Sequence, residues 1–191
     1  MKPNIQVLEK SFRVVLNVLG LDVDDPSLKD TPKRMAKMYV GELFSGLYSK
    51  RPKVTVFPND GSYNQMIVLK NTRVVSTCEH HFLPFTGRAW VAYLPRRTGN
   101  IVGVSKLARV VNWWARRPQV QERLTQQIAD YLNKVLDPKG VIVVIEAVHN
   151  CMVCRGVMEE QTSMVTSAFH GEFEEPEVRA EFFSLMNRGG A

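Results

Sequence analysis

Apolar residues in the first fifty positions recur every three or four residues, which is the spacing of one face of an α-helix. The first set of such positions is Leu8, Phe12, Val15 and Leu19. A second helix is predicted to start with Thr31 as its N-cap and Pro32 in the first helical position, and to end at Gly46. Residues 1–50 are therefore expected to form an N-terminal helical region.

The pattern changes after residue 50, where short runs rich in β-branched residues are separated by Pro, Asn, Asp and Gly. Such runs predict antiparallel strands joined by turns. The predicted strands are 53–57, 65–75, 88–94, 141–153 and 165–173. Two helices with apolar stripes, 105–115 and 118–135, lie between them, and 188–191 is expected to be a frayed tail. The predicted class is α+β, with a helical region at 1–50 and a second domain with one antiparallel sheet at 51–191.

Length and composition limit the function classes. With 191 residues, 45% of them hydrophobic, the chain can form one compact domain with a helical appendage. The longest apolar run, 141–145, is too short to span a bilayer, and no secretory signal pattern is present, so a cytoplasmic protein without a membrane partner is expected. The net charge of +6 fits a solvated basic surface, a polyanionic small substrate or nucleic acid, and charge alone does not separate these.

Two short segments hold most of the residues that bind transition metals. Together they contain all three cysteines and three of the four histidines, namely Cys78, His80, His81, His149, Cys151 and Cys154. An odd number of cysteines in a chain without an export signal argues against a disulfide framework. Thiolate and imidazole are the donors that Zn²⁺ prefers, so the two segments predict a zinc site.

The number of ligands separates a structural from a catalytic site. A closed structural site would use all three cysteines together with His81, whereas three ligands would leave a position open, as catalytic zinc requires. In the predicted strand 141–153, side chains two apart share a face, so His149 and Cys151 should point the same way and Cys154 the other way. This favours an open Cys₂His site with Cys154 as a small buried residue.

Several motifs, in this order, make the sequence similar to the GTP cyclohydrolase I family between about Thr31 and Phe183. The motifs are Thr31-Pro-Lys-Arg34, Ser76-Thr-Cys-Glu-His-His81, Gly103-Val-Ser-Lys-Leu107, Arg117-Pro-Gln-Val-Gln-Glu-Arg-Leu-Thr125, Ala147-Val-His-Asn-Cys151 and Arg155-Gly-Val157. The resemblance implies a tunnelling fold, in which a four-stranded antiparallel sheet is backed by two long helices. It also implies a toroidal homodecamer with active sites at subunit interfaces.

The reaction implied by the resemblance converts GTP and water into 7,8-dihydroneopterin triphosphate and formate, the first step of pterin and tetrahydrofolate-type biosynthesis. The implied zinc ligands are Cys78, His81 and Cys151. His149 and His80 would serve as general acid/base groups, and Ser105 would lie near the ribose. Each histidine could instead be a packed residue beside the metal, and Ser105 could also be a helix N-cap.

Substrate contacts are implied in the same way. The residues that match phosphate-binding positions are Lys106, Arg109, Arg155 and Arg34, the last reaching in from another subunit. Glu122 matches the residue that accepts two hydrogen bonds from guanine, and Gln121 could read another edge of the ring. The alternative is that these residues belong to solvated helix surfaces.

Some positions depart from the family pattern, namely Gln65, Thr162, Met164 and His170. None is a proposed ligand or base contact, so they bear on affinity and regulation and leave the reaction class untouched. Two other functions are less consistent with the sequence. A zinc-stabilised nucleic-acid module, suggested by the basic charge and Trp113-Trp114, lacks a second pair of finger ligands, so no nucleic-acid partner is expected. A sister enzyme of the same fold is not expected to combine the zinc triad with the 117–125 motif.

Overall fold

The computed structural model describes residues 3–188, and the chain forms two compact units, Met1–Lys50 and Arg51–Ala191. The first unit contains helices α1 (Ile5–Val18), α2 (Thr31–Met38) and α3 (Ser45–Tyr48), with a π-helical turn at Tyr39–Leu43 between the last two. The Asn4 side chain caps α1 by accepting a hydrogen bond from the backbone N–H of Val7 at 3.1 Å. The predicted tail falls largely on residues 189–191, outside the described residues.

Two details of the first unit differ from expectation. Asp30 is the N-cap of α2, so Thr31 is the first helical residue and Pro32 the second. The face of α1 that turns inward carries Leu8, Phe12 and Leu16, whereas Val15 and Leu19 are exposed. The true stripe therefore follows a strict spacing of four residues.

The second unit is built on a five-stranded sheet with the strand order β5-β2-β3-β6-β7. Its strands are β2 (Ile67–Cys78), β3 (Pro84–Leu94), β5 (Pro118–Gln119), β6 (Gly140–His149) and β7 (Met164–Gly171). All neighbours are antiparallel except β5, which runs parallel to the end of β2. A separate two-stranded ribbon pairs β1 (Val56–Pro58) with β4 (Asn100–Val102).

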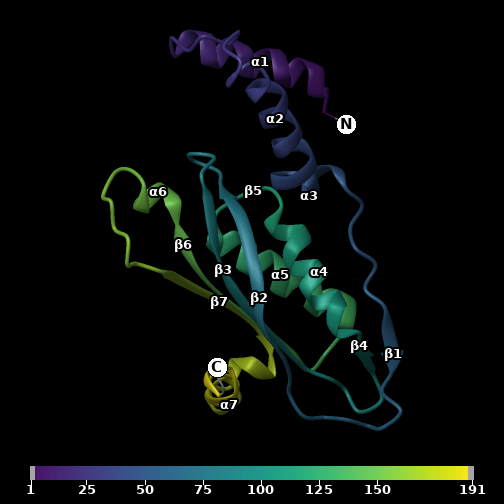
Figure 1. Ribbon diagram of the computed structural model, residues 1–191. Helices are drawn as coiled ribbons and strands as arrows, with labels where there is room; N and C mark the ends of the chain where they lie inside the picture. The colour runs from purple at the N-terminus through teal and green to yellow at the C-terminus, as the bar shows by residue number, and fades with distance from the viewer. Residues whose placement is uncertain (1–2, 189–191) are drawn as a thin grey trace. The chain divides into compact units, whose positions relative to one another are not determined.

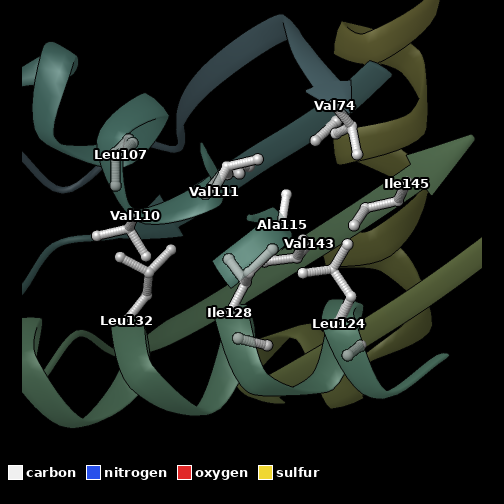
Figure 2. Close-up of a cluster of buried hydrophobic side chains, with 14 of the residues drawn as sticks. Val74, Leu107, Val110, Val111, Ala115, Leu124, Ile128, Leu132, Val143 and Ile145 are labelled. Atoms are coloured by element: carbon white, nitrogen blue, oxygen red, sulfur yellow. The ribbon is translucent and has the colours of Figure 1, made fainter. Parts of the chain in front are cut away.

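Helices α4 (Val104–Ala115) and α5 (Gln121–Leu136) cover one face of this sheet (Figure 1). Their apolar stripes meet alternate residues of β2 and β6 in a closely packed core (Figure 2). The labelled side chains of that core are Val74, Leu107, Val110, Val111, Ala115, Leu124, Ile128, Leu132, Val143 and Ile145. Because side chains alternate along a strand, Ile142 and Val144 face the other way and pack with Phe173 and Phe182 of the C-terminal segment. The strand β6 is thus buried on both faces, which explains its unbroken apolar run.

A β-bulge in β2 changes which side of the sheet its residues face. Leu69 pairs with Val91 and Thr72 with Ala89, so β2 has one residue more than β3 in this interval. Asn71, within the bulge, has a φ of 57°, a conformation that Asn tolerates better than most residues. As a result, odd-numbered residues before the bulge and even-numbered residues after it, up to Cys78, pack in the same core.

The α+β class is confirmed, and both central helices lie close to their predicted limits. The prediction that one strand continues to Val153 is wrong: β6 ends at His149, and Asn150–Val153 forms the short helix α6. The sequence reading also missed helix α7 (Pro176–Asn187), which begins with a proline at its first position. Among the described residues, none of the helices combines the length and apolarity that crossing a bilayer needs.

Replacing Ile128 by Ala should destabilise the second unit by about 2–5 kcal/mol, because Ile128 is fully buried between the helices and the sheet. Denaturant unfolding followed by circular dichroism measures the change. Lys134→Ala, at an exposed position of the same helix, is the matched control and should change stability by less than about 0.5 kcal/mol. Equal effects of the two substitutions would contradict the assignment of Ile128 to the core.

Candidate metal centre and the residues around it

Cys78, His81 and Cys151 come together at one end of the sheet, although the last two are 70 positions apart in the sequence. Their possible ligand atoms all lie within 4.8 Å of one another. Cys78 ends β2, His81 lies in the β2–β3 turn, and Cys151 lies in α6 directly after β6. Figure 1 shows this turn, α6 and β5 at the same end of the sheet, with α7 at the opposite end.

The donor atoms of this triad suit a thiophilic metal ion. Cys78 Sγ lies 3.8 Å from Nδ1 of His81 and 3.7 Å from Nδ1 of His80. Burial, followed by the neighbouring Cys78 thiol, raises the pKa of the Cys151 thiol, whereas the charge of Arg155 lowers it. Two sulfurs and one imidazole in such proximity match the ligand chemistry of zinc, and three protein ligands leave a position for water or substrate. The chain can therefore hold a metal ion here.

Local backbone hydrogen bonds shape the turn that carries His80 and His81. The backbone N–H of Phe82 donates to the carbonyl of Cys78 at 2.9 Å, and the N–H of Cys78 donates to the carbonyl of Leu83 at 2.8 Å. Phe82 has a φ of 54°, which allows the chain to reverse within this short turn. His80 and His81 are both exposed beside the buried Cys78, so the turn presents two imidazoles on one rim.

Cys154 lies outside this triad, as the geometric argument from the sequence expected, but its surroundings differ from those expected. It is exposed rather than buried, and its thiol donates to the carbonyl of Asn150 at 2.9 Å. The reason is that α6 replaces the expected strand, so residues 151 and 154 are separated by a helical turn instead of by strand alternation.

His149 lies at the end of β6, on the face covered by α5. Its ring stacks on the buried ring of Phe85, with centroids 4.6 Å apart and planes 9° from parallel. Its Nε2 lies 2.8 Å from the side-chain oxygen of Gln121. Burial lowers the pKa of His149, while the negative charge of Glu122 raises it. Sequence analysis missed Phe85, which is brought opposite His149 by the β3–β6 register.

The first turn of α5 is tied to the cysteine turn. Cys78 pairs with Gln119, and the backbone N–H of Glu79 donates to the carbonyl of Gln119 at 3.0 Å. The guanidinium of Arg123 forms an ion pair with the carboxylate of Glu79, which lowers the pKa of that carboxyl. Glu122, between Gln121 and Arg123, is exposed. These contacts hold the predicted base-contacting segment beside the metal triad.

The predicted phosphate contacts occupy three places. Arg155 lies at the triad itself, where its Nη1 donates towards Nε2 of His81 at 3.2 Å. Lys106 and Arg109 lie on the first two turns of α4 and are half-buried and exposed, respectively. Arg34 lies in the other compact unit, exposed and 3.7 Å from the carboxylate of Asp30.

Ser105, expected near the ribose, is exposed in the first turn of α4. The N-cap of this helix is Gly103, so the capping alternative for Ser105 is wrong. Gln121, expected to read an edge of the base, is only 1% exposed, and its side chain points into the protein, where it bonds with β6 and β7.

Comparison with known proteins decides the family. The family model described as GTP cyclohydrolase I matches residues 8–187. The chain belongs to the GTP cyclohydrolase I family. A protein from Flavobacterium johnsoniae named GTP cyclohydrolase 1 is 47% identical over 183 residues, covering 95% of this chain and 81% of the relative. Proteins of the same name from Aeromonas hydrophila and Vibrio cholerae are 47% and 46% identical, each over 95% of this chain and over 83% and 87% of their own lengths.

One solved structure, the archaeosine synthase QueF-Like in its apo form, superposes with a TM-score of 0.46 at 18% identity. The superposition covers 56% of this chain and 93% of that one. The family membership rests on the sequence comparisons, which extend over nearly the whole chain. The resemblance inferred from the sequence motifs is therefore confirmed.

Metal content provides a direct test of the triad. Purified protein should contain about one metal ion per chain, and Cys151→Ser should lose it because a hydroxyl is a poor replacement for a thiolate ligand. Cys154→Ala is the matched control, since that thiol bonds only within its own helical turn, and it should retain the ion. Inductively coupled plasma mass spectrometry measures both. Equal loss in the two variants would argue for a closed site with all three cysteines.

Proposed function

We propose that this chain is a zinc-dependent GTP cyclohydrolase I that converts GTP and water into 7,8-dihydroneopterin triphosphate and formate. The observation that carries the proposal is the convergence of Cys78, His81 and Cys151 in a member of this family. The reaction would be the first step of pterin and tetrahydrofolate-type biosynthesis, in the cytoplasm. An assay for formate and for a fluorescent pterin after incubation with GTP tests it directly.

The three ligands would hold Zn²⁺, whose chemistry in such a site is to polarise a bound oxygen and activate water near neutral pH. The residues of the chain provide the proton transfers. His149, whose ring is oriented by Phe85 and Gln121, would protonate the departing nitrogen of the imidazole ring, and His80 on the exposed rim is the second acid/base group. Ser105 would act at the ribose after formate has left.

The triphosphate needs several cations, and Arg155 supports this role best because it already lies beside His81. Its planar guanidinium can bind two phosphate oxygens at once. Lys106 and Arg109 would contribute from α4, and Arg34 would come from a neighbouring subunit. The net charge of +6 favours the approach of a polyanionic substrate.

Glu122 would bind the guanine base by accepting hydrogen bonds from its N1–H and its 2-amino group. Its position supports the role: it lies in the first turn of α5, and it is close enough to His149 for its charge to raise the pKa of that residue. Adenine has no proton on N1 and no 2-amino group, so ATP would leave the carboxylate without partners. Sites built on such polar matching discriminate strongly.

Glu122→Gln should lower kcat/KM for GTP by roughly 10- to 150-fold, because hydrogen bonds to a charged group contribute about 1.5–3 kcal/mol. The steady-state rate of formate release measures the effect, and ATP should not be turned over at all. Glu177→Gln, an exposed glutamate in the first turn of α7, is the matched control and should behave as the wild type. Near-normal GTP turnover in Glu122→Gln would remove this residue from base recognition.

We further propose that residues 51–191 form a tunnelling-fold catalytic domain, that residues 1–50 form an N-terminal helical region, and that the chain assembles into a homodecamer. The strand β7 supports the assembly: it forms an edge of the sheet, and an edge strand presents unpaired backbone groups to a neighbour. Active sites would then lie at subunit interfaces, with Arg34 supplied by the adjacent chain.

A shared active site predicts complementation between two inactive variants. Arg34→Ala and Cys151→Ser should each have little activity alone, but when they are co-expressed about a quarter of the sites in randomly mixed oligomers would have both residues intact. Light scattering should show a large oligomer in every case. Absence of recovered turnover in a mixed oligomer would mean that Arg34 acts within its own subunit or takes no part in the site.

A further inference from the structure

Gln121 is buried, and its side-chain amide has hydrogen-bond acceptors on one side and His149 on the other. Its amide nitrogen lies 3.0 Å from the carbonyl oxygen of Ile145, 2.8 Å from that of Met164 and 3.1 Å from Oγ1 of Thr166. Backbone carbonyls can only accept hydrogen bonds, so the group facing them must be the NH₂. The amide oxygen therefore points at His149.

The hydrogen bonds of the Thr125 and Thr166 hydroxyls independently support this orientation of the Gln121 amide. Oγ1 of Thr125 donates its proton to the backbone carbonyl of Gln121 at 2.8 Å. Thr125 and Thr166 are 2.6 Å apart at their hydroxyl oxygens, and because the only proton of Thr125 is already used, Thr166 must be the donor of that pair. The Thr166 oxygen is then left to accept from the Gln121 amide. If the Gln121 amide were flipped, its oxygen would lie against three hydrogen-bond acceptors and none of them could donate to it.

The orientation of the amide determines which nitrogen of His149 carries a proton. An amide oxygen only accepts, so the 2.8 Å contact requires a proton on Nε2 of His149. Stacking on Phe85 keeps the ring plane in place, and turning the ring over within that plane would put the carbon Cε1 where Nε2 lies and lose the contact with Gln121. Nε2 therefore carries a proton and donates it to Gln121, and in the neutral ring Nδ1 is the nitrogen without a proton.

We infer that Gln121 is a positioning residue, which fixes the ring of His149 by accepting a hydrogen bond from its Nε2–H and so holds it in the tautomer with Nδ1 unprotonated. The inference rests on the acid/base role proposed above for His149. This role replaces contact with the guanine base as the function of Gln121. The residue is only 1% exposed, and its amide donates hydrogen bonds to β6 and β7 instead.

The tautomer can be measured in the wild-type enzyme. The chain has four histidines, so ¹⁵N-histidine labelling gives four pairs of ring-nitrogen signals, and the pair missing from His149→Asn identifies His149. Solid-state nuclear magnetic resonance, which has no size limit, should show protonated Nε2 and unprotonated Nδ1 for the neutral ring. A proton on Nδ1 with bare Nε2 would overturn the inference, whatever the activities of the variants.

Gln121→Met tests the consequence for turnover. The variant keeps the side-chain length but removes the acceptor, so the signal of His149 should change to a mixture of tautomers. We expect kcat to fall by roughly 10- to 100-fold, the usual effect of losing an orienting partner, with little change in KM for GTP. A raised KM with unchanged kcat would overturn the inference and would instead support a contact between Gln121 and the guanine base.

Gln119→Met is the matched control. Gln119 is equally buried and also donates to a backbone carbonyl, that of Trp114, but its amide bonds with Gln127 and Arg123 rather than with a histidine. This variant should leave the His149 signal unchanged. Equal changes at His149 in both variants would overturn the specific role of Gln121. Full activity of His149→Asn would contradict the acid/base role proposed for His149 while leaving the measured tautomer in place.

Discussion

The register of β3 between β2 and β6 is the constraint on which the site depends. Thr77 pairs with Pro84, and His149 pairs with Phe85, so the ends of two strands distant in sequence meet across the first residues of β3. Gly87 makes this pairing possible, because a Cβ at that position would collide with the carbonyl of Glu146 and lie 2.6 Å from Cα of Ala147. Strand pairing alone thus brings Cys78 and His149 to one end of the sheet, and the chain leaving β6 adds Cys151.

The triad could be predicted from the sequence because chelating side chains are rare and were grouped in two segments. The central helices α4 and α5 were also predictable, since their apolar stripes face a single core. The short helix α6 was not, because Cys151-Met-Val follows an apolar run that no Pro or Gly interrupts to mark the end of the strand. The role of Gln121 was equally hidden. Its neighbours in the sequence indicate a helix surface, whereas its partners Ile145, Met164 and Thr166 come from strands that only the fold brings near.

The start of α5 serves two functions on opposite sides of one helical turn. Gln121 points inward and orders the histidine, whereas Glu122 is exposed in the same turn. The Arg123–Glu79 ion pair and the pairing of β5 with β2 attach this turn to the cysteine loop. Groups that would bind the base, transfer protons and hold the metal therefore share one rigid support, which keeps their distances constant without a long loop.

The extra residue at the Asn71 bulge shifts the alternation of side chains along β2 by one position. Residues before and after it belong to the same core only because one extra residue lies between them. Loss of that residue would leave Ile67 and Leu69 in place and turn Cys78 to the opposite side of the sheet. No single substitution could reverse such a change. The packing of Cys78 in the core therefore depends on the number of residues in β2 as well as on their identity.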